Sequence, residues 1–251
     1  LESATELTVK EQLLRQIGNI YYNQKDYLNA EKYFSQATNK DLEILKKLRF
    51  ICGKIKKFKQ MIEATEQILQ LPGVNQSEKP MYFQQLANYY YGIKNYQKTV
   101  DYSKQFLELH QKDDMSKFLM VHIQAIAQKE LGAANDAIEL LQANLPKLEK
   151  LSEKPNKEQL LNAKYQMVIV EALINKNEIQ SAMKIITELI ANFKNTNLYP
   201  EILCKKAFAL EKIGASEAAK KVYSSILEIP KISQKDKWYK LAKQKISNAS
   251  Q

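Results

Sequence analysis

Small and large apolar side chains recur in the same order along this 251-residue chain, at intervals of 34 to 45 residues. The first copy places large, small and aromatic side chains at Leu14, Ile17, Gly18, Tyr21, Ala30, Phe34 and Ala37. Further copies return around Cys52, Ala87, Ala125, Val170 and Ala207. Together the six copies span about nine-tenths of the sequence, which indicates a chain built from internal repeats.

The spacing within each copy favours two antiparallel helices. Residues three and four apart share one face of a helix, and small residues there let two helix axes approach closely. Large residues one turn away fill the remaining space. Pro80 and Pro200 fall at the first position of their predicted helices, where a missing N–H is tolerated. Asn156 with Gln159 predicts a capping pair at another helix start.

This pattern resembles the tetratricopeptide repeat (TPR) family, whose unit is 34 residues long. The resemblance implies an all-α, right-handed superhelical solenoid of about six antiparallel helix pairs, forming one domain over residues 1–251. The expected repeats cover approximately residues 11–44, 45–78, 80–113, 118–151, 163–196 and 200–233. Trp238, Leu241 and Ala242 lie on one stripe of a further segment, about residues 234–249, which predicts a C-terminal capping helix.

Composition excludes sheet-rich folds and most catalytic motifs. Glycine and proline number six each, too few for the frequent turns of a sandwich or barrel. The closest two glycines lie 19 positions apart, so no phosphate-binding loop or nucleophile elbow can form. His110, His122, Cys52 and Cys204 cannot supply an ordinary zinc or haem motif. We therefore predict a protein that is not an enzyme and that has no cofactor and no metal.

The resemblance also implies that the first helix of each repeat lines a concave groove. The candidate partner-binding residues are Arg15, Asn19, Tyr22, Lys46, Arg49, Lys56, Gln84, Asn88, Tyr91, His122, Ile126, Met167, Ile174 and Phe208. In the last three repeats the groove positions also carry Lys129, Glu171, Asn175, Glu211 and Lys212. The groove is thus expected to be basic and polar in its amino-terminal half and more apolar in its carboxy-terminal half. Arg49 and Lys56 are expected to be exposed.

These positions predict a non-catalytic scaffold that binds a peptide or protein, such as an acidic or extended segment, in its groove. Arg15 and Asn19 occupy positions where chaperone-binding members of the family begin a carboxylate clamp. Phe50, Met81 and Gln85 replace the rest of that clamp, so binding to chaperone C-termini is not predicted. A hydrated groove face with no fixed ligand is the plain alternative. Another is an assembly subunit that packs against itself or a fixed complex, for which residues 1–9, which precede the first repeat, are the candidate contact segment.

Net charge raises one further class of partner. The chain carries a formal charge of +10, and residues 46–59 hold seven cations and no acid. Nucleic acid or an anionic surface could attract such a chain. Because the basic run spans one helix and its turn, its charges point in several directions, and nucleic-acid binding is not expected.

Cys204 is the thiol on the groove side, and we expect it to be inert.

The compartment is unknown from the sequence. The chain begins at Leu1 without a methionine, which slightly favours an exported protein of the bacterial periplasm or envelope over a cytoplasmic adaptor. Two isolated cysteines suit either compartment.

Overall fold

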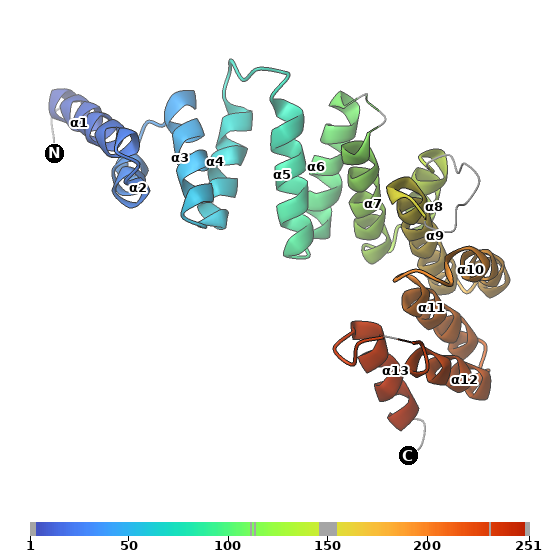
Figure 1. Cartoon of the computed structure of the whole chain (residues 1–251). Helices are drawn as coiled ribbons and strands as arrows, with labels where there is room; N and C mark the ends of the chain where they lie inside the picture. Colours follow the sequence, from blue (N-terminus) through green and yellow to red (C-terminus); the bar gives the residue numbers. More distant parts are fainter. Residues whose placement is uncertain (1–3, 111, 113, 146–154, 231, 249–251) are drawn as a thin grey trace. The chain divides into compact units, whose positions relative to one another are not determined.

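The computed structural model describes residues 4–110, 112, 114–145, 155–230 and 232–248. These residues form helices and turns without any strand, so the predicted all-α fold is confirmed (Figure 1). The helices are α1 (Ala4–Asn23), α2 (Tyr27–Gln36), α3 (Leu42–Lys54), α4 (Phe58–Gln70), α5 (Lys79–Gly92), α6 (Tyr96–Leu109), α7 (Met115–Glu130), α8 (Ala134–Ala143), α9 (Lys157–Asn175), α10 (Ile179–Phe193), α11 (Tyr199–Lys212), α12 (Ser216–Leu227) and α13 (Lys237–Asn248). Residues 1–3, 111, 113, 146–151, 231 and 249 of the expected segments lie outside the described residues.

Consecutive helices pair, and the pairs stack. The chain divides into two compact units, unit 1 (Leu1–Gln111) and unit 2 (Lys112–Gln251). In unit 1, α1 packs on α2, α3 on α4 and α5 on α6, and the pairs meet through α2 with α3 and α4 with α5. In unit 2, α7 packs on α8, α9 on α10 and α11 on α12, and the pairs meet through α8 with α9 and α10 with α11. The predicted capping helix is α13, which packs on α11 and α12.

The first helix of each pair ends in the same turn. A residue with a left-handed backbone closes the helix at Lys25, Lys56, Lys94, Gly132, Asn177 and Gly214. In the first pair, the Lys25 N–H donates to the Tyr22 carbonyl (3.0 Å) and the Asp26 N–H donates to the Tyr21 carbonyl (2.9 Å). The other five turns repeat both hydrogen bonds. This is the Schellman motif, which satisfies the last carbonyls of a helix and reverses the chain.

These turns give the register of the repeats directly. The left-handed residue lies 14 positions after the expected repeat start in five pairs, but 11 positions after it in the second pair, where Lys56 follows residue 45. The groove positions assigned to the second pair are therefore displaced by three residues. Seven positions before the turn residue, the other pairs carry small side chains or valine, and the second pair carries Arg49.

The apolar core of each unit lies between its stacked helices. In unit 1, Phe34, Ile51 and Ile68 are fully buried in one cluster. In unit 2, Tyr223 and Ala242 are buried in a cluster against which Trp238 packs. The tryptophan thus anchors α13 to the end of unit 2. Within the described ranges, every helix is too short or too polar to cross a membrane.

Candidate binding surface on the first helices

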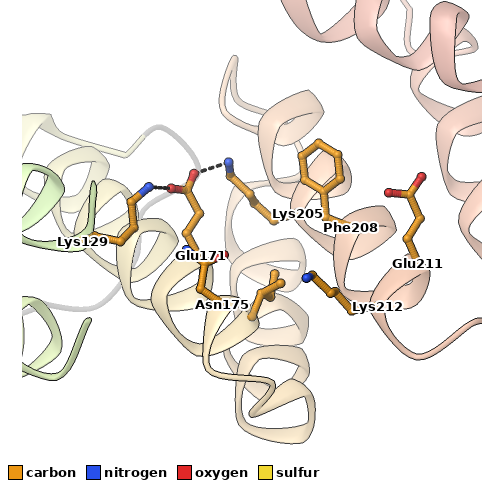
Figure 2. Close-up of a pocket in the computed structure, with 8 residues that line it drawn as sticks. Lys129, Glu171, Asn175, Lys205, Phe208, Glu211 and Lys212 are labelled. Carbon is orange, nitrogen blue, oxygen red and sulfur yellow. Dashed lines mark hydrogen bonds and ion pairs between the residues drawn. The ribbon is translucent and has the colours of Figure 1, made fainter. Parts of the chain in front are cut away.

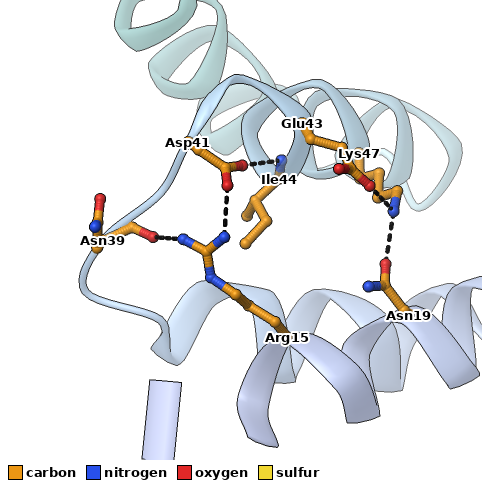
Figure 3. Close-up of polar contacts among 7 residues, drawn as sticks. All are labelled: Arg15, Asn19, Asn39, Asp41, Glu43, Ile44 and Lys47. Atoms are coloured by element: carbon orange, nitrogen blue, oxygen red, sulfur yellow. Dashed lines mark hydrogen bonds and ion pairs between the residues drawn. The ribbon is translucent and has the colours of Figure 1, made fainter. Parts of the chain in front are cut away.

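In unit 1, the two residues that the sequence resemblance placed at the start of a carboxylate clamp are engaged within the protein itself. Figure 3 shows Arg15 and Asn19 reaching from α1 toward the start of α3. The Arg15 guanidinium donates to Asp41 Oδ2 and to the Asn39 carbonyl, each at 2.5 Å. The Asn19 side-chain oxygen accepts from Lys47 Nζ at 2.6 Å. Arg15 and Asn19 therefore hold neighbouring helix pairs together.

Lys46 and Arg49 are also paired, and both contact the next helix pair. Lys46 Nζ lies 2.7 Å from a carboxylate oxygen of Glu78, whose hydrogen bond raises the pKa of Lys46. Arg49 Nε donates to Gln85 Oε1 at 2.9 Å, and its guanidinium lies 5.0 Å from the centre of the Tyr82 ring. Burial lowers the pKa of Arg49. The expectation that Arg49 is exposed is wrong, because the three-residue displacement turns it toward α5.

The remaining candidates in unit 1 are dispersed over three first helices. Tyr22 meets the ring of Phe50 edge-on, with centroids 6.1 Å apart. Asn88 is exposed on α5 and donates to the Gln84 carbonyl one turn earlier, while Gln84 and Tyr91 are half-buried. Lys56 is exposed at its turn, as expected. Among the basic candidates of unit 1, Arg15, Lys46 and Arg49 are therefore engaged within the unit, and Lys56 is exposed.

In unit 2, three first helices enclose a pocket of about 360 Å³. Its lining comes from α7, α9 and α11, and consists of Lys129, Glu171, Ile174, Asn175, Lys205, Phe208, Glu211 and Lys212. Figure 2 shows Glu171 between two lysines, with Phe208 on the neighbouring helix. All of these residues except Lys205 stand at positions that the sequence assigned to the groove.

Glu171 is the electrostatic centre of this pocket. One carboxylate oxygen pairs with Lys129 and the other with Lys205. The side chains of the two lysines are only 10% and 8% exposed. Burial by itself would raise the pKa of Glu171, but the ammonium groups of Lys205 and Lys129 outweigh it and lower the pKa below its usual value. Lys129 also pairs with Glu130 at 2.9 Å, and Glu171 is itself partly exposed, so the bridge joins two nearly buried lysines through carboxylates that solvent reaches.

A second set of contacts builds the wall beside this bridge. Lys205 lies over the rings of Trp238 and Phe208, with its Nζ 5.2 and 5.9 Å from their centres. Lys245 of α13 pairs with Glu211 at 2.9 Å and lies 5.4 Å from the Phe208 ring centre. Such cation–π contacts favour a fixed ring orientation. Phe208 is thus held in place by two lysines while part of its surface remains exposed.

The other predicted residues of unit 2 lie in different surroundings. Phe208 and Ile174 line the pocket, and Phe208 is partly exposed there, whereas Ile174 and Met167 are only 6% and 4% exposed and so present little surface to a partner. Ile126 is half-buried. His122 stacks on Tyr165, with ring centroids 5.8 Å apart. Burial, together with Lys164, lowers the pKa of His122 to about 4, so this imidazole is neutral near pH 7.

Sequence reasoning missed Lys205, although a signal for it exists. Glu171 and Lys205 are opposite charges separated by 34 residues, which is one repeat length. Glu211 and Lys245 have the same separation. Residues one repeat apart lie side by side on stacked helices, so opposite charges at that interval predict an ion pair.

Both cysteines are buried within their units. Burial raises the pKa of Cys52 to about 11 and that of Cys204 to about 12. Because the thiolate is the reactive form, neither thiol is poised for chemistry near neutral pH.

The paired helices, the recurring turn and the stacking within each unit define a helical-repeat solenoid. No family model matches the sequence, and neither does any curated protein. Among solved structures, the apo form of RapI is similar over 99% of this chain and 75% of its own, with 15% identity and a TM-score of 0.66. The TPR-like repeats of a proposed kinesin light chain from Podospora anserina are 16% identical, cover 92% of this chain and 100% of theirs, and give a TM-score of 0.50. The chain has the tetratricopeptide-repeat fold, as the sequence predicted.

Proposed function

We propose that this protein is a non-catalytic scaffold that binds a peptide or protein segment on the first helices of unit 2, with the pocket around Phe208 as the anchor. The observation that supports this most directly is the combination of apolar and polar groups in that pocket. The partly exposed ring of Phe208 offers an apolar surface beside the buried Ile174, while Asn175 and Lys212 are exposed at the edge of the pocket. Pockets of this size with a few oriented polar groups are typical of binding sites.

The chemistry of the pocket favours a polypeptide with mixed side chains. Phe208 can take an aromatic or aliphatic side chain, Asn175 can pair with a backbone amide, and Lys212 can pair with a carboxylate. An extended chain advances about 3.3 Å per residue and neighbouring helices lie about 10 Å apart, so about ten residues would cross the three helices. The preferred ligand is therefore an extended segment with an acidic and an apolar residue.

The same pocket offers little for catalysis. Its two carboxylates, Glu171 and Glu211, are held in ion pairs with lysines. Within the described residues, no three histidine, cysteine or acidic side chains gather into a metal-binding group. These features support a binding role and give no general base or nucleophile in an activated state.

In this proposal, the positive charge of the chain attracts an acidic partner from a distance and does not form a carboxylate clamp. Because Arg15, Lys46 and Arg49 are engaged within unit 1, they are poorly placed to bind a carboxylate of a partner. The net charge of +10 would instead attract an acidic partner over a distance and speed its association. This attraction weakens as salt is added.

The test uses a displayed library of random peptides about ten residues long, selected on the full chain. We expect the enriched peptides to combine an acidic with an aromatic or aliphatic residue. Their dissociation constants should rise at least about tenfold for Phe208→Ala and several-fold for Lys212→Glu, about 1.4 kcal/mol per tenfold. Lys221→Glu, an exposed lysine on α12, is the matched control and should bind like the wild type. Enriched peptides that bind all four proteins equally would overturn the proposal.

A further inference from the structure

Helix α1 carries an apolar stripe that the described residues of unit 1 leave exposed. Val9, Leu13 and Ile20 are 49%, 51% and 55% exposed. Val9 and Leu13, together with Leu14 and Ile17, line a shallow depression of about 370 Å³. These side chains repeat at intervals of three and four residues, so they occupy one face of α1.

On α3, α5, α9 and α11, the first helices that follow another pair in the same unit, the face that corresponds to this stripe is buried. Twelve positions before the turn residue, Leu13 is matched by Ile44 on α3, Tyr82 on α5, Tyr165 on α9 and Ile202 on α11. Those four side chains are between 0% and 4% exposed, against 51% for Leu13. Each of these helices packs against the second helix of the pair before it, namely α2, α4, α8 and α10.

We infer that this face of α1 is a dimer interface, on which the α1 helix of a second copy packs. The face continues the stacking interface that operates within both units, so what fits it is a helix with an apolar stripe. α1 is itself such a helix. In an isologous dimer, the same patch meets itself across a two-fold axis.

Charge favours a second copy here and opposes it elsewhere. The whole chain carries +10, so most of its surface repels another copy. α1 carries two acids and two bases, Glu6, Glu11, Lys10 and Arg15, and so has no net charge. Glu11 accepts from the Thr38 N–H at 2.7 Å and Arg15 pairs with Asp41, so both are directed toward the segment after α2. The apolar face is the neutral part of a basic molecule.

The geometry places Leu13 near the centre of such an interface. The intervals from Val9 to Leu13, Ile17 and Ile20 suit the seam of two packed helices. Because Leu13 is near the middle of the stripe, it faces its own copy in either a parallel or an antiparallel pairing. One helix face buries less than a standard interface, so we expect a dissociation constant in the micromolar range.

Cross-linking tests the position of the contact. Leu13→Cys introduces an accessible thiol into a chain whose two native cysteines are buried. Under mild oxidation we expect a disulfide-linked dimer to form at least about tenfold faster than with the matched control Leu28→Cys. Leu28 is 65% exposed on α2 and lies outside the stripe. Equal rates for the two variants would place the contact elsewhere and overturn the inference.

Sedimentation equilibrium tests the dimer without cross-linking. Between about 1 and 500 µM, a range that brackets a micromolar constant, the wild-type mass should rise from 29.0 kDa toward twice that value. Leu13→Glu should weaken dimerisation at least about tenfold, and Leu28→Glu should not. A wild type that stays monomeric throughout, or a dimer insensitive to Leu13→Glu, would refute the interface. Because α1 is remote in sequence from the unit 2 pocket, peptide binding tested separately can survive that refutation.

Discussion

The ring of Phe34 lies so close to Gly18 that a Cβ at position 18 would come within 2.7 Å of it. Phe34 is fully buried, and the contact joins α1 to α2. Close approach of two helix axes is the reason for a small residue at this point of the repeat.

Gly18→Ala tests this contact. Helix propensity alone would favour alanine by about 1 kcal/mol, whereas overpacking a rigid ring costs about 1–3 kcal/mol. We expect the free energy of unfolding, measured by urea denaturation, to fall by about 1 kcal/mol. Gly92→Ala is the control, since Gly92 also lies in a helix and a Cβ there meets nothing within 4 Å. If both variants are stabilised, the tight contact is not present.

Lys94→Gly tests the left-handed turns. Lys94 has a φ of 60°, which costs a residue with a Cβ about 1–2 kcal/mol and costs glycine little. Part of that gain is offset by the greater freedom of glycine in the unfolded chain, so we expect a net stabilisation of about 0.5 kcal/mol. Lys104→Gly, an exposed lysine inside α6, should instead destabilise by about 1 kcal/mol. Thermal melts of the two variants should move in opposite directions.

Arg49→Glu and Lys56→Glu compare the stability contributed by a half-buried cation with that contributed by an exposed one. Arg49→Glu removes a hydrogen bond to Gln85 and the stacking on Tyr82, and places a carboxylate near Glu78. We expect a loss of about 2 kcal/mol in unfolding free energy. Lys56 is exposed, and its reversal should stay within about 0.5 kcal/mol. Equal losses would contradict the displaced register of the second pair.

Glu171→Gln should strongly destabilise unit 2. The substitution removes the carboxylate that the nearly buried Lys129 and Lys205 share, and leaves Lys129 paired with Glu130 alone. Removing one member of a fully buried ion pair costs about 3–5 kcal/mol, and because Glu171 is partly exposed and Lys129 keeps its pair with Glu130, we expect about 2 kcal/mol. Glu217→Gln, an exposed acid on α12, is the control and should change stability by less than about 0.5 kcal/mol.

The same carboxylate sets a pH dependence. The folded-state pKa of Glu171 is lowered, so its stabilising contribution is complete above the unfolded-state value of about 4.3 and is lost as the pH falls through the folded-state value. We expect the wild type to lose stability more steeply than Glu171→Gln below about pH 4.3. Urea midpoints measured from pH 6 to pH 3 would show it, and parallel profiles would contradict it.

The fold was predictable because small residues such as Gly18, Ala87 and Ala207 mark where helices approach, and they return at the same position of different repeats. The register of the second pair was not. Ile51 and Cys52 fit the pattern three residues away from their true positions, because apolar residues three apart share a helix face. The turn at Lys56 would have decided the register, but lysine gives no sequence signal for a left-handed backbone.

The sequence predicted which positions line the candidate site, but it did not predict which of their charged side chains pair with other residues. The groove positions assigned on α9 and α11 include Glu171, Ile174 and Phe208, which line the unit 2 pocket. What the residue types alone cannot show is which cations are engaged. Lys46 and Arg49 look like free charges in the sequence and are held by neighbouring helices in the fold.

Glu171 affects how unit 2 unfolds. A helical-repeat array is held by contacts between neighbours, so its end pairs can fray while the middle stays folded. The Glu171 carboxylate joins α7, α9 and α11, so the three helix pairs to which they belong are expected to unfold together. Unit 2 should therefore melt cooperatively, and a ligand that fills the adjacent pocket would stiffen all three pairs at once.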